Sequence, residues 1–114
     1  MDIEVKKSLL NFPLALLSLV SVSLLWKSWS LLTLILLVIG VLMLLIEKER
    51  NTVLVYIAAG LGGAITEMVA IFFGVWTYTD PAIAGIPIWL PFLWGAAALY
   101  ILRLKAFVDA VFRK

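Results

Sequence analysis

One acidic residue, Glu67, stands inside the apolar stretch GGAITEMVAIFFGVWTY, which covers residues 62–78. A carboxylate in the middle of a bilayer costs about 2.5–3.5 kcal/mol on insertion scales, and ionisable residues in such places usually mark functional sites. Burial favours the neutral form of the acid, which can donate or release a proton. We therefore predict that Glu67 is the centre of a site, as a polar ligand contact or as a catalytic acid.

The composition indicates that the solvent around Glu67 is lipid. Of the 114 residues, 65% are hydrophobic and 14% are charged, against about half and about a quarter in typical soluble domains. A small soluble domain of this composition would lack the polar surface that keeps it in solution. The net charge of +2 gives little attraction for nucleic acid. Because cysteine and histidine are both absent, we expect no metal site, no cofactor and no disulfide.

Four apolar runs are long enough to cross a bilayer as helices, because its core of ~30 Å needs about 20 residues. We place these spans at about residues 8–26, 29–46, 52–78 and 86–104. Unpaired backbone groups are costly in lipid, which leaves helices as the only option at this length. The predicted fold is an all-α, integral membrane four-helix bundle, formed by residues 1–114 as a single domain.

The basic residues predict the orientation of this bundle. Eight of the nine lysines and arginines precede the first span, separate the second from the third, or lie at the end of the fourth. The ninth, Lys27, lies between the first two spans. The positive-inside rule then places both termini in the cytoplasm, and we expect a cell (inner) membrane protein. Arg103, near the end of the fourth span, is expected to snorkel to the cytoplasmic interface.

Small residues share the depth that the sequence assigns to Glu67. At 1.5 Å per residue, Glu67 lies ~16 Å below Tyr78, which places the carboxyl near the bilayer midplane. The same count leads to Ala97 in the fourth span, Gly40 in the second and Ala15 in the first. We therefore expect room for a ligand at this level, although small residues also serve close helix packing.

The candidate site combines residues from three spans. The predicted ligand-binding residues are Asn11, Ser18, Gly63, Thr66, Glu67, Ala70, Trp94 and Ala97. Among them, Asn11, Ser18 and Thr66 carry the polar groups that we expect to hydrogen-bond the Glu67 carboxyl.

Prolines are expected to shape the fourth span. Pro87 fits its first turn, where the missing N–H does no harm. Pro91 should kink or open the helix four residues later. An opened helix would let Trp94 and Ala97 bound a cavity over Glu67 that faces the outer leaflet.

The series GGAITE, FGVWTYT and AGIPIWLPFLW, within residues 60–94, resembles the carotenoid-biosynthesis membrane family that includes bacterioruberin-type hydratases. Members show a glycine-rich helix with a glutamate, then FG-x-Y-x-Y and GVP-x-x-x-P-x-x-W segments. They are about twice as long, and Trp76 stands here in place of the first motif tyrosine. The same stretch is similar to a family of small uncharacterised four-span bacterial inner-membrane proteins. GGAITE also looks like the glutamate motif of small multidrug transporters, which carry it in their first span.

Three functions stay open on the sequence. The first is an intramembrane site around Glu67 that binds or processes an apolar isoprenoid- or lipid-like molecule. The second is a proton-coupled small-molecule exporter, in which two copies of Glu67 in a homodimer face one cavity. The third is a structural or partner subunit of a membrane complex. No second acid, base or metal ligand stands out beside Glu67, so whether a reaction is catalysed is also open.

Overall fold

The computed structural model describes residues 2–112. Its helices, in chain order, are α1 (Ile3–Leu25), α2 (Trp29–Glu47), α3 (Arg50–Phe72) and α4 (Leu90–Phe112). Strand-like pairing within these residues is limited to an isolated bridge between Ile83 and Ile86. The all-α prediction is confirmed.

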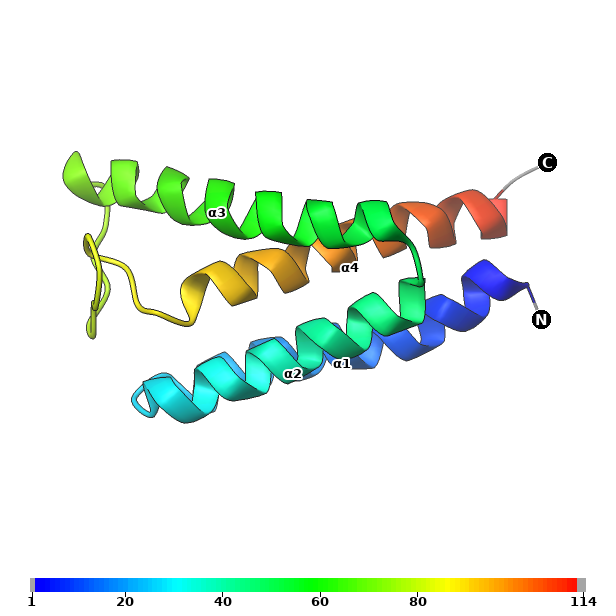
Figure 1. Ribbon diagram of the computed structural model, residues 1–114, viewed down its shortest axis with the longest axis horizontal. Helices are drawn as coiled ribbons and strands as arrows, with labels where there is room; N and C mark the ends of the chain where they lie inside the picture. Colours follow the sequence, from blue (N-terminus) through cyan, green and yellow to red (C-terminus); the bar gives the residue numbers. More distant parts are fainter. Residues whose placement is uncertain (1, 113–114) are drawn as a thin grey trace.

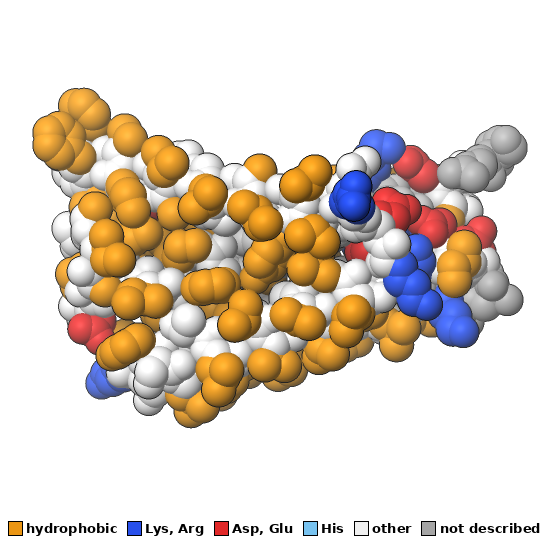
Figure 2. All heavy atoms as spheres, viewed as in Figure 1, with side chains coloured by type: hydrophobic (Ala, Val, Ile, Leu, Met, Phe, Trp, Pro, Cys, Tyr) orange, Lys and Arg blue, Asp and Glu red, His pale blue; other side chains and the backbone are white. Residues whose placement is uncertain are grey.

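Three of the helices, α1, α2 and α3, are long and apolar enough to span a membrane. Their outward faces carry many exposed leucine, isoleucine and valine side chains, which Figure 2 shows spread over the surface between the two ends. Monomeric soluble proteins rarely expose apolar surface on this scale. The structure therefore supports a membrane protein with transmembrane helices. Helix α4 is equally long, with 23 residues, and carries charged residues in its second half.

The helices form two antiparallel pairs, α1 with α2 and α3 with α4 (Figure 1). Helix α4 also packs against α1 and α2, whereas α2 and α3 touch little although they are consecutive. The start of α1 and the end of α4 lie at one end of the bundle, here called the terminal end. The connection from α3 to α4 lies at the opposite end, here called the loop end. Helix α4 is thus the element that joins the two pairs.

Two apolar clusters fill the interior. The first consists of Leu32, Leu36, Ala64, Ile86, Trp89 and Leu90. The second consists of Ile39, Met43, Ala96 and Leu99. Beside the second cluster, Gly40 and Gly95 make room for Tyr56, since a Cβ at these glycines would come within 2.5 Å and 2.7 Å of it. Gly40 therefore faces Tyr56, which precedes Glu67 by three helical turns in α3. The prediction that Gly40 lies at the same depth as Glu67 is wrong.

The ends of α3 and α4 differ from the predicted spans. Helix α3 ends at Phe72 instead of residue 78, and α4 begins at Leu90 instead of residue 86. Gly74 has a φ of 77°, a left-handed conformation that glycine adopts without steric cost and that commonly terminates helices. Residues 73–78 are as apolar as the helix before them, so hydropathy alone extends the span too far.

Pro91 is the second residue of α4. In the first turn of a helix a missing N–H breaks no intrahelical hydrogen bond. Pro91 therefore lies at the start of α4 in the structure, whereas the sequence predicted a kink within the helix. Pro87 lies before the helix, and its carbonyl accepts a hydrogen bond from the Leu90 N–H at 3.2 Å.

A buried ion pair joins three helices at the terminal end. Arg103 of α4 is only 3% exposed. Its Nε donates to Oε2 of Glu47 at 2.8 Å, and its Nη2 donates to Oε1 at 2.6 Å. Its Nη1 donates to the backbone carbonyl of Glu4 in α1 at 2.9 Å. The predicted snorkelling of Arg103 is wrong, because Glu47 offers a bidentate partner inside the bundle.

We predict that Glu47→Gln strongly destabilises the fold, because it leaves the buried Arg103 charge without its main counter-charge. Removing one partner of a buried ion pair costs about 3–5 kcal/mol. We expect the lower part of that range, since Glu4 Oε1 lies 3.5 Å from the Arg103 Nη2. The free energy of unfolding in detergent measures the change.

Lys105→Gln is the matched control for this substitution. It breaks the exposed ion pair between Asp109 and Lys105, whose atoms are 2.6 Å apart. Exposed pairs contribute little to stability, so the unfolding free energy should change far less. Equal losses in the two variants would contradict a stabilising role for the buried pair.

Candidate functional site

Glu67 is buried on α3, with 8% of its surface exposed. The Tyr78 hydroxyl donates a hydrogen bond to its Oε1, and the Trp94 indole Nε1–H donates to its Oε2. An indole N–H can only donate, so Oε2 must be the acceptor of that bond. The two bonds connect α3 with the loop that follows it and with α4.

Tyr78 is the partner that sequence reasoning missed. In an unbroken helix Tyr78 would lie about 16 Å from Glu67 along the helix axis. The chain leaves the helix at Phe72 and turns at Gly74, which brings Tyr78 back to Glu67. A glycine just after a helical run indicates where the helix ends, and Gly74 is that glycine here.

Gly63 explains how Trp94 reaches the carboxyl. Gly63 and Glu67 are four residues apart and so lie on the same face of α3. A Cβ at Gly63 would overlap the Trp94 ring, whereas a Cβ at Gly62 would meet nothing within 4 Å. The indole therefore lies directly against the helix backbone at Gly63, with its N–H one turn from that glycine, at Glu67.

A cavity of about 390 Å³ opens beside the carboxyl. Its lining comprises Val22, Glu67, Tyr78, Trp89, Leu90, Leu93, Trp94 and Ala97. The Tyr78 and Trp89 rings meet edge to face, with centroids 6.3 Å apart, a favoured aromatic geometry. Most of the lining is hydrocarbon, with its polar groups concentrated around Glu67. Small-molecule sites of this size typically combine apolar walls with a few placed polar groups.

The predicted residues of α3 and α4, apart from Ala70, border two neighbouring cavities. Glu67, Trp94 and Ala97 border the cavity beside the carboxyl. Gly63 and Thr66 border a neighbouring cavity of about 320 Å³, which Trp94 and Ala97 also line. The Thr66 hydroxyl donates to the Gly62 carbonyl at 2.8 Å and not to Glu67. Ala70 is half-buried and lines neither cavity.

The predicted residues of α1 do not bond to Glu67. The Ser18 hydroxyl donates to the carbonyl of Leu14 at 3.1 Å, the usual back-bond of a helical serine. Asn11 is fully buried, and within residues 2–112 neither its Oδ1 nor its Nδ2 has a hydrogen-bond partner. The partners expected for the carboxyl, Asn11, Ser18 and Thr66, are therefore replaced by Tyr78 and Trp94.

Glu67 lies closer to the loop end than its sequence position suggests. It stands five residues before Phe72, the last residue of α3, which is ~7.5 Å at 1.5 Å per residue. Figure 1 shows the end of α3 reaching beyond the start of α4. The placement of Glu67 midway along a long span is therefore wrong, because the helix is shorter than predicted.

Comparison with protein-family models, with curated proteins and with solved structures finds no match for this chain. The resemblances to carotenoid-biosynthesis membrane proteins and to small four-span bacterial proteins therefore stay predictions. Within the described part of the chain, no three His, Cys, Asp or Glu side chains gather closely enough to hold a metal ion.

We predict that Gly63→Ala breaks the hydrogen bond between Trp94 and Glu67, whereas Gly62→Ala preserves it. The added methyl group overlaps the indole at position 63 and enters open space at position 62. The measurement is the indole N–H resonance of Trp94 in micelles, identified by its loss in Trp94→Phe. It should shift in Gly63→Ala alone, and an unmoved resonance in that variant would contradict the contact.

Proposed function

We propose that this protein is an integral membrane protein that binds an apolar isoprenoid- or lipid-like molecule in the Glu67 cavity. The observation that carries the proposal is a hydrocarbon-lined cavity of about 390 Å³ with one buried carboxyl on its wall. The carboxyl already has a donor on each oxygen, from Tyr78 and Trp94. A molecule with a long apolar body and one polar head group fits this distribution of chemistry.

The carboxyl of Glu67 supplies the contact for the head group. Each of its oxygens has two lone pairs and accepts one hydrogen bond from the protein, so each can accept another from a ligand hydroxyl. Because Tyr78 and Trp94 hold the carboxyl in place beforehand, binding costs little additional ordering. Val22, Leu90 and Leu93 offer apolar walls to the remainder of the molecule.

The packing and the charges support the membrane setting of this proposal. We infer that α4 crosses the bilayer with the other helices, since it packs on all three of them. Figure 2 shows most of the visible basic side chains at the terminal end, and Lys27 lies in the turn between α1 and α2 at the opposite end. The positive-inside rule then orients both termini to the cytoplasm. In that orientation the cavity belongs to the outer leaflet of a cell membrane.

Binding of the isoprenoid alcohol farnesol to the purified protein in lipid nanodiscs tests the proposal. Glu67→Leu removes the acceptor of the head group and should weaken binding about tenfold, as for a hydrogen bond of ~1.5 kcal/mol. Ala97→Leu fills the cavity and should abolish binding. Ala58→Leu is the matched control, because Ala58 is exposed on α3 and does not line the cavity.

Three outcomes would contradict the proposal. Unchanged farnesol binding in Ala97→Leu would show that the cavity is not the binding site. Binding lost in Glu67→Leu but retained in Ala97→Leu would assign Glu67 to holding the loop, as in a structural subunit. Equal effects of Ala97→Leu and Ala58→Leu on farnesol binding would likewise show that binding does not depend on the cavity.

A further inference from the structure

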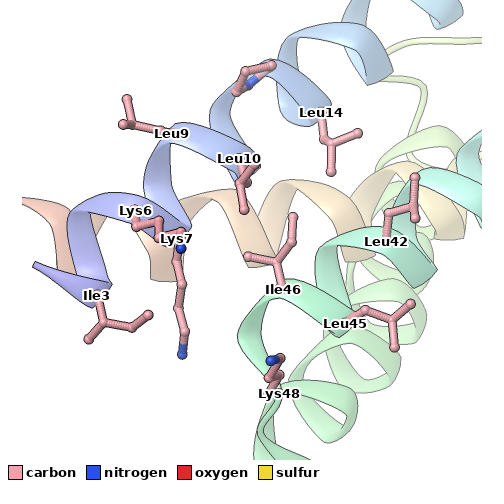
Figure 3. Close-up of a pocket in the computed structure, with 11 residues that line it drawn as sticks. Ile3, Lys6, Lys7, Leu9, Leu10, Leu14, Leu42, Leu45, Ile46 and Lys48 are labelled. Atoms are coloured by element: carbon pink, nitrogen blue, oxygen red, sulfur yellow. The ribbon is translucent and has the colours of Figure 1, made fainter. Parts of the chain in front are cut away.

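A second groove lies at the terminal end of the bundle, between the start of α1 and the end of α2 (Figure 3). Its volume is about 800 Å³, larger than that of the Glu67 cavity. Leucines of both helices form its walls, among them Leu10 and Leu14 of α1 and Leu42 of α2. Figure 3 shows Leu10 and Ile46 pointing toward one another between the helices. The groove thus offers hydrocarbon on both sides to an extended apolar chain.

Three lysines, Lys6, Lys7 and Lys48, line the same groove, and its lining contains no carboxylate. Lys7 is held in place, because its Nζ donates to the backbone carbonyl of Glu47 at 3.1 Å. An ammonium group has three N–H donors, so two of them are left for a ligand. Of the two acids that flank Lys48 in the sequence, Glu47 directs its carboxylate to Arg103 at 2.6 Å, and Glu49 does not line the groove. Glu4, two residues before Lys6, also faces Arg103, with its Oε1 3.5 Å from the Arg103 Nη2, so these two carboxylates are engaged outside the groove.

We propose that this groove binds an anionic phospholipid, with an acyl chain between α1 and α2 and the phosphate at the three lysines. Basic pockets between membrane helices attract anionic head groups, and each lysine near the surface contributes to the attraction. Lys6 and Lys7 lie near the start of α1, and Lys48 directly follows the end of α2. Leu14 and Leu42 continue the groove toward the middle of the bundle. A phospholipid in a bilayer has the same order, with phosphate at the surface and hydrocarbon below it. The groove lies at the opposite end from Glu67, so this inference does not rest on the proposed function.

Native mass spectrometry of the full-length protein in detergent, titrated with phosphatidylglycerol or phosphatidylcholine, tests the charge requirement. We expect the wild-type protein to bind phosphatidylglycerol more tightly. Lys6→Gln with Lys48→Gln should lower its affinity about fivefold for each lysine removed. Arg50→Gln with Lys105→Gln is the matched control, since it removes two charges from the same end outside the groove. Equal losses in the two double variants would overturn the proposal.

A second pair of variants tests the groove itself without changing any charge. Leu10→Trp fills the groove and should abolish the preference for phosphatidylglycerol. Leu16→Trp places the same side chain on an exposed position of α1 outside the groove and should leave the preference intact. Unchanged binding in Leu10→Trp would overturn the proposal. Competition by soluble glycerol 3-phosphate at equal concentration would overturn it too, because the site would then take the phosphate without the acyl chain.

Discussion

The carboxyl group of Glu67 holds the loop end of this bundle together. Its oxygens accept hydrogen bonds from Tyr78 and Trp94, which ties α3 to the loop after it and to α4. A buried polar group without partners costs about 1–3 kcal/mol or more, so both donors are needed once the helices have packed. The cavity follows from the same contacts, because Tyr78 and Trp94 also form part of its wall.

Polar contacts near both ends of α4 set its position in the bundle. Near its start Trp94 is bound to Glu67, and in its second half Arg103 is bound to Glu47 and Glu4. Apolar side chains distinguish poorly between a neighbouring helix and lipid, so packing and interhelical hydrogen bonds must provide the specificity. Close approach at Gly63 and Gly95 supplies the packing, and the two polar contacts fix how far α4 lies along its neighbours.

Composition and run length were sufficient to predict an all-helical membrane protein, because they depend on residue type and not on partners. The errors arose where a neighbour from elsewhere in the chain decides the outcome. Arg103 was expected at the interface because its partner Glu47 lies 56 residues away in sequence. Glu67 was recognised as unusual from its residue type alone. Its donor Tyr78 was missed because the predicted third span continued past the true end of α3, which Gly74 marks. Trp94 and Ala97 border the Glu67 cavity, although they were predicted from a fourth span starting near residue 86, whereas α4 begins at Leu90.

The coupling free energy between Glu67 and Tyr78 tests most directly whether the carboxyl organises the loop end. It is obtained from the unfolding free energies of the wild type, Glu67→Leu, Tyr78→Phe and the double variant. A hydrogen bond to a carboxyl group predicts a favourable coupling of at least about 1 kcal/mol. A coupling below about 0.3 kcal/mol, the range of independent sites, would contradict the account, because Tyr78 would then hold its position without Glu67.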